Sequence, residues 1–190
     1  MDVNLMAHED GIPPQPKAAS ETISLRLDRV ALNTIRNEAR QKEVSVNTLL
    51  NQIIKQHVRW HSYASKAGFI TVRKQLIMQL INQLDEEEIS NIAKGISGES
   101  KDFVLLLRNE YRLESVLDVL QTWVTISGYK YKSEIKGNTQ LHIIQHDMGK
   151  KWSLYLADLF RHIFEELKIR KMDFDTTDNT LSFVLHLASP

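Results

Sequence analysis

The sequence predicts an α+β protein with two domains. Residues 21–62 show one short alternating strand followed by two amphipathic helices, and residues 68–190 show a run of helices followed by two helix-strand-strand units. A chain of 190 residues can hold two small domains, although the first segment is too small to bury a core of its own. Hydrophobic residues at 42% and charged residues at 25% are typical of a globular protein.

The predicted strand is Thr22-Ile23-Ser24-Leu25-Arg26-Leu27, in which apolar and polar side chains alternate. A strand without a neighbour leaves backbone N–H and C=O groups unpaired on both edges, and the segment that follows is helical. We therefore expect the strand to pair with the same strand of a second copy across a two-fold axis. Such a two-stranded ribbon would present Thr, Ser and Arg side chains, a surface suited to reading the DNA major groove.

Two helices are predicted after this strand. Asp28 is a good N-cap for a first helix over residues 29–42, and Ser45 for a second helix that ends near His61 or Tyr63. The second helix has an apolar stripe broader than one short helix can cover, which again indicates a dimer. Its members are Val46, Leu49, Leu50, Ile53, Ile54 and Val58.

The order of strand, helix, tight turn and helix over residues 21–61 resembles the ribbon-helix-helix family of DNA-binding proteins. The segments that carry the resemblance are TISLRL, at residues 22–27, and SVNTLL, at residues 45–50. The resemblance implies an obligate homodimer in which the base-reading residues are Thr22, Ser24 and Arg26.

The resemblance also implies a phosphate contact at the start of the second helix. Main-chain N–H groups at Ser45, Val46 and Asn47 would hold a DNA phosphate, a role that fits the free donors and positive dipole end of a helix N-terminus. The family often has Gly before this turn, where the present chain has Glu43. We expect Glu43 to be strained in a left-handed conformation and to place a negative charge near the phosphate.

Charge is unevenly distributed along a chain whose net charge is zero. Residues 21–62 carry seven bases and four acids, a net charge of +3, whereas residues 1–20 and 68–190 each carry a net charge of −2. A basic excess on the strand and its two helices agrees with a phosphate partner. Residues 1–20 are polar, contain three prolines and have no periodicity, so we expect a flexible arm.

Residues 68–190 are predicted to form an effector-sensing or oligomerising domain. A brief strand is expected at residues 69–72 and helices at residues 73–84, 85–95, 101–111 and 113–127. Residues 118–146 align without gaps on residues 158–186, which places the turn Gly137-Asn138 on Thr177-Asp178. The expected product is an αββαββ unit with one antiparallel sheet and helices on one face.

Candidate chemistry in this domain is sparse. His142 and His146 lie on one side of a strand but about 13 Å apart, too far to share a metal without further ligands such as His162 or His186. The nickel-responsive repressors join a ribbon-helix-helix to a metal-binding domain, but their Cys ligand has no counterpart here. We predict strand-face histidines and no metal or cofactor.

One turn is a candidate for binding an anionic effector. Gly149, Lys150 and Lys151 stand at the predicted start of a helix, where an anion would find N–H donors and two cations. The alternative is a glycine turn followed by a solvated basic pair.

The sequence thus predicts a homodimeric, sequence-specific DNA-binding regulator whose partners are double-stranded DNA and a second copy of itself. The alternative is a protein-interaction module, an antitoxin or scaffold, with a dimerising head. No nucleophile, phosphate-loop or paired-carboxylate pattern predicts an enzyme. The absence of Cys fits a cytoplasmic protein, and no apolar run approaches the ~20 residues that span a bilayer.

Overall fold

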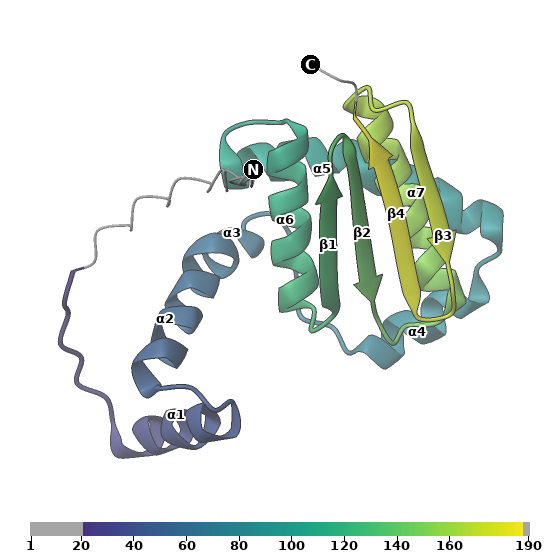
Figure 1. Ribbon diagram of the computed structural model, residues 1–190. Helices are drawn as coiled ribbons and strands as arrows, with labels where there is room; N and C mark the ends of the chain where they lie inside the picture. The colour runs from purple at the N-terminus through teal and green to yellow at the C-terminus, as the bar shows by residue number, and fades with distance from the viewer. Residues whose placement is uncertain (1–20, 188–190) are drawn as a thin grey trace, which may run out of the picture. The chain divides into compact units, whose positions relative to one another are not determined.

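The computed structural model describes residues 21–187 (Figure 1). By its contacts the chain divides into two compact units with a boundary between Val46 and Asn47, and each is described by itself. The predicted arm, residues 1–20, lies outside the described residues. No helix within the described range is both long and apolar enough to cross a membrane.

Helix α1 (Arg29–Gln41) is the main element of the first unit. The carboxylate of Asp28 accepts a hydrogen bond of 2.9 Å from the N–H of Ala31, which confirms the predicted N-cap. The helix ends in a Schellman turn, in which the N–H of Val44 donates to the carbonyl of Ala39 and the N–H of Glu43 to that of Arg40. Glu43 has a φ of 54°, so the residue at the left-handed position is a glutamate, as expected.

The second helix is a continuous helical run that changes character near its end. It consists of α2 (Val46–Gln56), a π-helical turn η1 (His57–His61) and a last turn α3 (Ser62–Ala64). Trp60, in the π-helical turn, is buried and belongs to the core of the second unit. The predicted end at His61 or Tyr63 is confirmed to within a few residues.

Two predicted strands are not formed within the single chain. Residues 22–27 do not form a strand, because no strand among residues 21–187 pairs with them. Residues 69–72 do not form one either. The apolar residues there belong to a connecting segment, in which Phe69 packs its ring against Trp60 and Phe103.

Helices α4 (Lys74–Gln83) and α5 (Glu86–Arg108) follow. Asp85 and Glu88 form a capping box, each side chain accepting from the other's N–H at 2.8 Å, so the acidic run is a helix start. The prediction of two helices at 85–95 and 101–111 was wrong, because α5 is one helix that continues through Gly95 and Gly98. Its buried side, including Ile89, Ala93 and Val104, is maintained across the glycines, and packing along α7 outweighs their low helix propensity.

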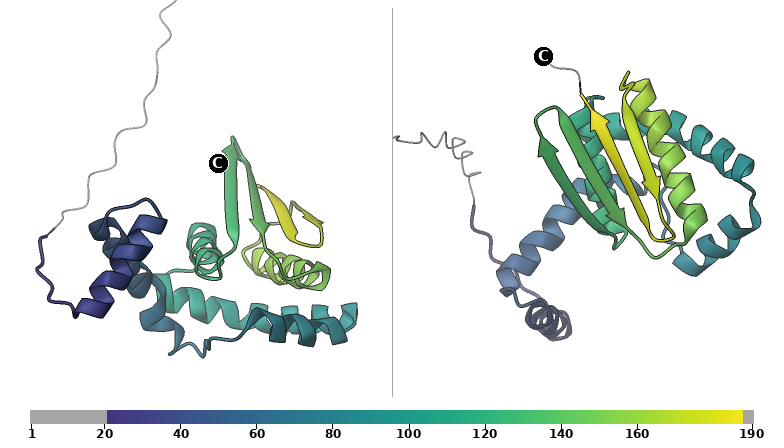
Figure 2. Two further views of the ribbon diagram at one scale, coloured as in Figure 1. Left: turned by 90° about the horizontal axis from the view of Figure 1, so that it is seen from below. Right: turned by 45° about the vertical axis from the view of Figure 1, so that its right-hand side comes forward.

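The sheet has four strands in the order β1-β2-β4-β3, and every neighbouring pair is antiparallel. The strands are β1 (Lys130–Lys136), β2 (Thr139–Gln145), β3 (Met172–Thr176) and β4 (Thr180–His186). Helices α6 (Leu113–Ile126) and α7 (Lys150–Glu166) cover one face of the sheet, and α5 lies on their far side (Figure 2). The predicted α+β class and antiparallel sheet are confirmed.

The predicted internal repeat holds in the helices and shifts by one residue in the hairpins. At an offset of 40 residues the ends of α6 and α7 match. The N–H of Tyr129 donates to the carbonyl of Val124 after α6, and the N–H of Ile169 donates to the carbonyl of Phe164 after α7. In the hairpins the pair Tyr131↔Ile144 corresponds to Met172↔Leu185, an offset of 41. One extra residue precedes β3, so the turn equivalent to Gly137-Asn138 is Asp178-Asn179 and not Thr177-Asp178.

Candidate nucleic-acid interface

The three predicted base-reading residues lie on one exposed stretch. Thr22, Ser24 and Arg26 alternate with apolar residues that are also exposed: Ile23 by 75%, Leu25 by 55% and Leu27 by 38%. Apolar side chains arranged in this way lose their contact with water only if a further surface covers them. The stretch therefore exposes alternating apolar and polar side chains, the pattern expected of one strand of a two-stranded ribbon.

Basic side chains accompany this stretch on α1. Arg29, Arg36 and Arg40 are all exposed, and Lys42 forms an ion pair of 2.7 Å with Glu38 on the same helix. An exposed pair of this kind contributes little to stability. The three exposed arginines are the side chains of α1 that a DNA phosphate backbone could reach.

The predicted phosphate-binding residues stand where α2 begins. Ser45 and Asn47 are exposed, Val46 is half-buried, and the carbonyl of Asn47 accepts a hydrogen bond of 3.0 Å from the side chain of Asn51. The first turn of α2 is exposed, and the N-terminal end of a helix is where main-chain N–H groups and the positive dipole end face an anion. Glu43 is also exposed, two residues before Ser45, and its charge opposes an anion there.

The histidines of the second unit are core residues. His142 is 3% and His146 is 5% exposed, a deeper burial than the strand-face position we predicted. The His146 Nε2 lies 2.9 Å from the Ser153 hydroxyl, and its Nδ1 accepts from the N–H of Met148, so this ring fastens β2 to the start of α7. Burial lowers the pKa of both histidines.

The described residues contain no cluster of three or more His, Cys, Asp or Glu able to hold a metal. His162 lies 3.6 Å from Glu165 and His186 lies 3.0 Å from Asp173, so each pairs with a carboxylate on its own helix or on a neighbouring strand. The arrangement does not bring the four histidines together as ligands.

The lysines of the predicted anion site are directed at carbonyl groups. The Lys150 ammonium donates to the carbonyl and hydroxyl oxygens of Thr176 at 2.6 and 2.9 Å. The Lys151 ammonium donates to the carbonyls of Asn82 (2.9 Å) and Leu84, at the end of α4. Both cations therefore hold the fold together, which favours the glycine-turn interpretation over the anion site.

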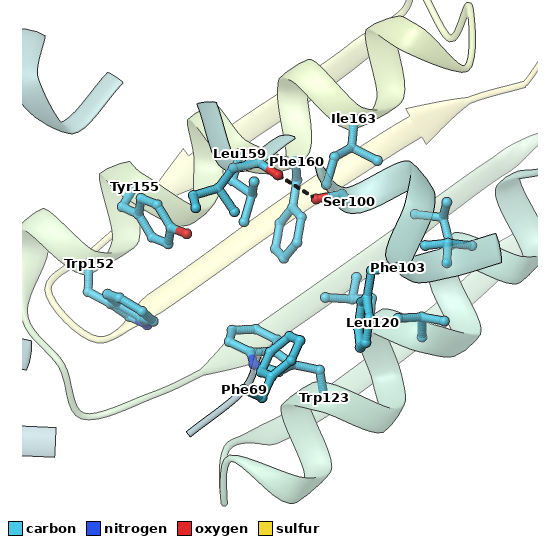
Figure 3. A pocket seen from close by; sticks show the side chains of 14 residues that line it. Phe69, Ser100, Phe103, Leu120, Trp123, Trp152, Tyr155, Leu159, Phe160 and Ile163 are labelled. Carbon is cyan, nitrogen blue, oxygen red and sulfur yellow. Dashed lines mark hydrogen bonds between the residues drawn. The ribbon is translucent and has the colours of Figure 1, made fainter. Parts of the chain in front are cut away.

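An apolar cleft that was not predicted from the sequence lies in the second unit, between α5, α6 and α7 (Figure 3). It has a volume of about 310 Å³ and a lining rich in aromatic rings. The signal in the sequence was the set of Trp and Tyr residues beside the core stripes of these helices, Trp123, Trp152 and Tyr155. Helical periodicity assigned Trp123 to a packing face and did not separate the core from a cleft.

Comparison with protein-family models and with curated proteins gives no match over any part of the chain. The assignment of a function therefore depends on the residues and contacts described above.

Proposed function

We propose that this protein is a homodimeric, sequence-specific DNA-binding regulator in which residues 21–62 form the reading head. Two copies of residues 22–27 pair as an antiparallel ribbon, with Thr22, Ser24 and Arg26 directed at base edges. The N–H groups at Ser45, Val46 and Asn47 hold a phosphate on each side. The remainder of the chain senses an effector or adds subunit contacts.

The observation that carries this proposal is the exposure of Ile23, Leu25 and Leu27 on a segment that pairs with no strand in the described part of the chain. Covering three such side chains gains about 25 cal/mol for each Å² of apolar surface removed from water, and pairing satisfies the ribbon backbone at the same time. A second copy does both, because its segment has the same alternation. The left-handed turn at Glu43, which separates α1 from α2, supports the same architecture.

The test replaces Arg26 by Ala and measures specificity instead of affinity alone. Duplexes are first selected from a random pool by the wild-type protein, and binding is then compared with that to an unrelated duplex. A bidentate Arg–base contact contributes about 1–3 kcal/mol, and the dimer has two, so the ratio of specific to non-specific affinity falls by roughly 30-fold or more. Sedimentation is expected to show an intact dimer.

Arg36→Ala is the matched control, since it removes the same charge from an exposed position on α1. It weakens binding to both duplexes equally and makes the salt dependence shallower. If Arg26→Ala still selected the same sequence as the wild type, the assignment of the reading face would be wrong. Binding that did not weaken with added salt would favour the alternative of a protein-interaction module.

A further inference from the structure

The cleft between α5, α6 and α7 has a closed floor and an aromatic rim. Its floor is formed by buried side chains, among them Val104, Val116 and Leu120. Trp152 and Tyr155, whose rings lie 5.0 Å apart, are partly buried and stand on one side of the opening (Figure 3). A volume of about 310 Å³ is at the lower end of the range for small-molecule sites, which lie at roughly 300–1,000 Å³.

The chemistry of the lining specifies a neutral ligand. None of the fourteen side chains that line the cleft is charged. The Ser100 hydroxyl donates to the carbonyl of Ile96 at 3.0 Å, on its own helix. Burial raises the pKa of Tyr155 to about 12, so this side chain also stays uncharged at neutral pH. An ionised group would lose its hydration in the cleft without gaining a counter-charge, whereas a flat hydrocarbon would stack on the rings.

The cleft is connected by ring contacts to the end of the second helix. Phe69 and Phe103 line it, with their centroids 4.8 Å apart. Both rings also meet Trp60 edge-on, at 5.1 and 5.3 Å. Trp60 lies in the π-helical turn of the run that begins at Val46, and π-helical turns are frequent at functional sites. A molecule that moves Phe69 or Phe103 therefore acts on the helix whose N-terminus we assign to phosphate binding.

We propose that this cleft binds one neutral, mainly aromatic small molecule, and that its occupation changes the affinity of the reading head for DNA through Phe69, Phe103 and Trp60. The first part depends only on the second unit, and the second part rests on the proposed function. The ligand class is a planar or polycyclic compound without an ionised group.

The first experiment uses a pair of fluorescent probes that differ by one charged group. N-phenyl-1-naphthylamine is neutral, and 1-anilinonaphthalene-8-sulfonate has a closely similar ring system with a sulfonate. The full-length protein, without DNA, is expected to bind the neutral probe saturably with one site per chain, and the sulfonate at least roughly tenfold more weakly. Absence of saturable binding, or equal affinity for both probes, overturns the proposed site. A second copy of the chain that already covers the cleft would also prevent saturable binding, and the proposal would then be wrong.

Ser100→Phe tests the location, because it places a ring inside the cleft at the cost of one intrahelical hydrogen bond. Glu99→Phe is the matched control, since it adds the same ring at an exposed neighbouring position outside the lining. We expect Ser100→Phe to reduce affinity for the neutral probe at least tenfold and Glu99→Phe to leave it within about twofold. Circular dichroism and thermal unfolding confirm that both variants fold. Equal binding by a folded Ser100→Phe protein refutes the assignment.

DNA affinity is then measured with and without saturating neutral probe. Allosteric coupling is typically about 5- to 150-fold, so we expect at least a roughly 5-fold change in the wild type and none in Ser100→Phe. A wild-type protein that binds probe and DNA independently refutes the coupling alone. A protein that binds probe but no DNA refutes the proposed function and leaves the ligand site in place.

Discussion

Acid is expected to destabilise the second unit in part through His142, a buried histidine of the sheet. His142 lies on β2 with its Nδ1 2.6 Å from the Tyr131 hydroxyl and its ring stacked on Phe183 at 4.7 Å. Its Nε2 is buried and has no hydrogen-bond partner among the residues that the structure describes. Because the ring is buried and no ion pair among the described residues compensates a charge on it, burial lowers the pKa of His142 from 6.5 to about 4.

The difference between the pKa of His142 in the unfolded and in the folded protein sets the sign and the size of the effect. The imidazole is neutral in the folded protein, so its contribution to stability is complete above the unfolded pKa of 6.5 and is lost as the pH falls towards the folded value of about 4. At about 1.36 kcal/mol for each pH unit between the two values, the full loss is about 3 kcal/mol. Most of it is expected by pH 4.5.

The assay is urea unfolding of the wild type and His142→Phe at pH 7.5 and pH 4.5. Phenylalanine keeps the stack on Phe183 and cannot be protonated, so every other titrating group cancels in the comparison. The wild type is expected to lose about 2–3 kcal/mol more than His142→Phe between the two pH values. His57→Gln, which removes an exposed histidine, retains the wild-type dependence. An identical loss in the wild type and His142→Phe would refute the reasoning.

Two further substitutions test the helix ends. Glu43→Gly is expected to stabilise the protein by about 1 kcal/mol, because a non-glycine residue in the left-handed region costs about 1–2 kcal/mol. Glu43→Ala is the control, because it removes the same charge but keeps a side chain at the left-handed position. Equal thermal midpoints for Glu43→Gly and Glu43→Ala would contradict the predicted backbone strain. Lys151→Met removes the donor to the last carbonyls of α4 and is expected to cost about 1–2 kcal/mol. Amide hydrogen exchange measures this loss: exchange in α4 is expected to be faster in Lys151→Met than in the wild type, and unchanged in a Lys94→Met control.

Local signals in the sequence were sufficient for the starts of helices α1 and α5. Asp28 fixes the start of α1 through a side-chain hydrogen bond to a backbone only three residues away, and Asp85 does the same for α5. The αL turn at Glu43 was also predictable, since a turn this tight requires a residue of positive φ whatever its type. Such interactions are encoded within a few residues of sequence.

Interactions between distant segments were harder to predict. Gly95 indicated a helix end, but packing of α5 along α7 keeps it helical, and the sequence near Gly95 contains no trace of that partner. The hairpin alignment missed one inserted residue before β3 because a shift by one changes which strand face is buried without changing its composition. The cleft was missed for a related reason, since its lining has the same composition as a core.

The corrected repeat places His142 at the centre of the sheet. With the hairpins aligned one residue later, His142 of the first repeat corresponds to Phe183 of the second, and these two residues are also direct partners across β2 and β4. The two repeats therefore meet at a pair in which one copy has a phenyl ring and the other an imidazole, stacked with 14° between their planes. Charging the imidazole places a cation at the centre of the sheet, against the ring that joins the two hairpins. The expected loss is therefore cooperative unfolding of the whole sheet and not fraying of an edge, which is why global unfolding is the appropriate measurement.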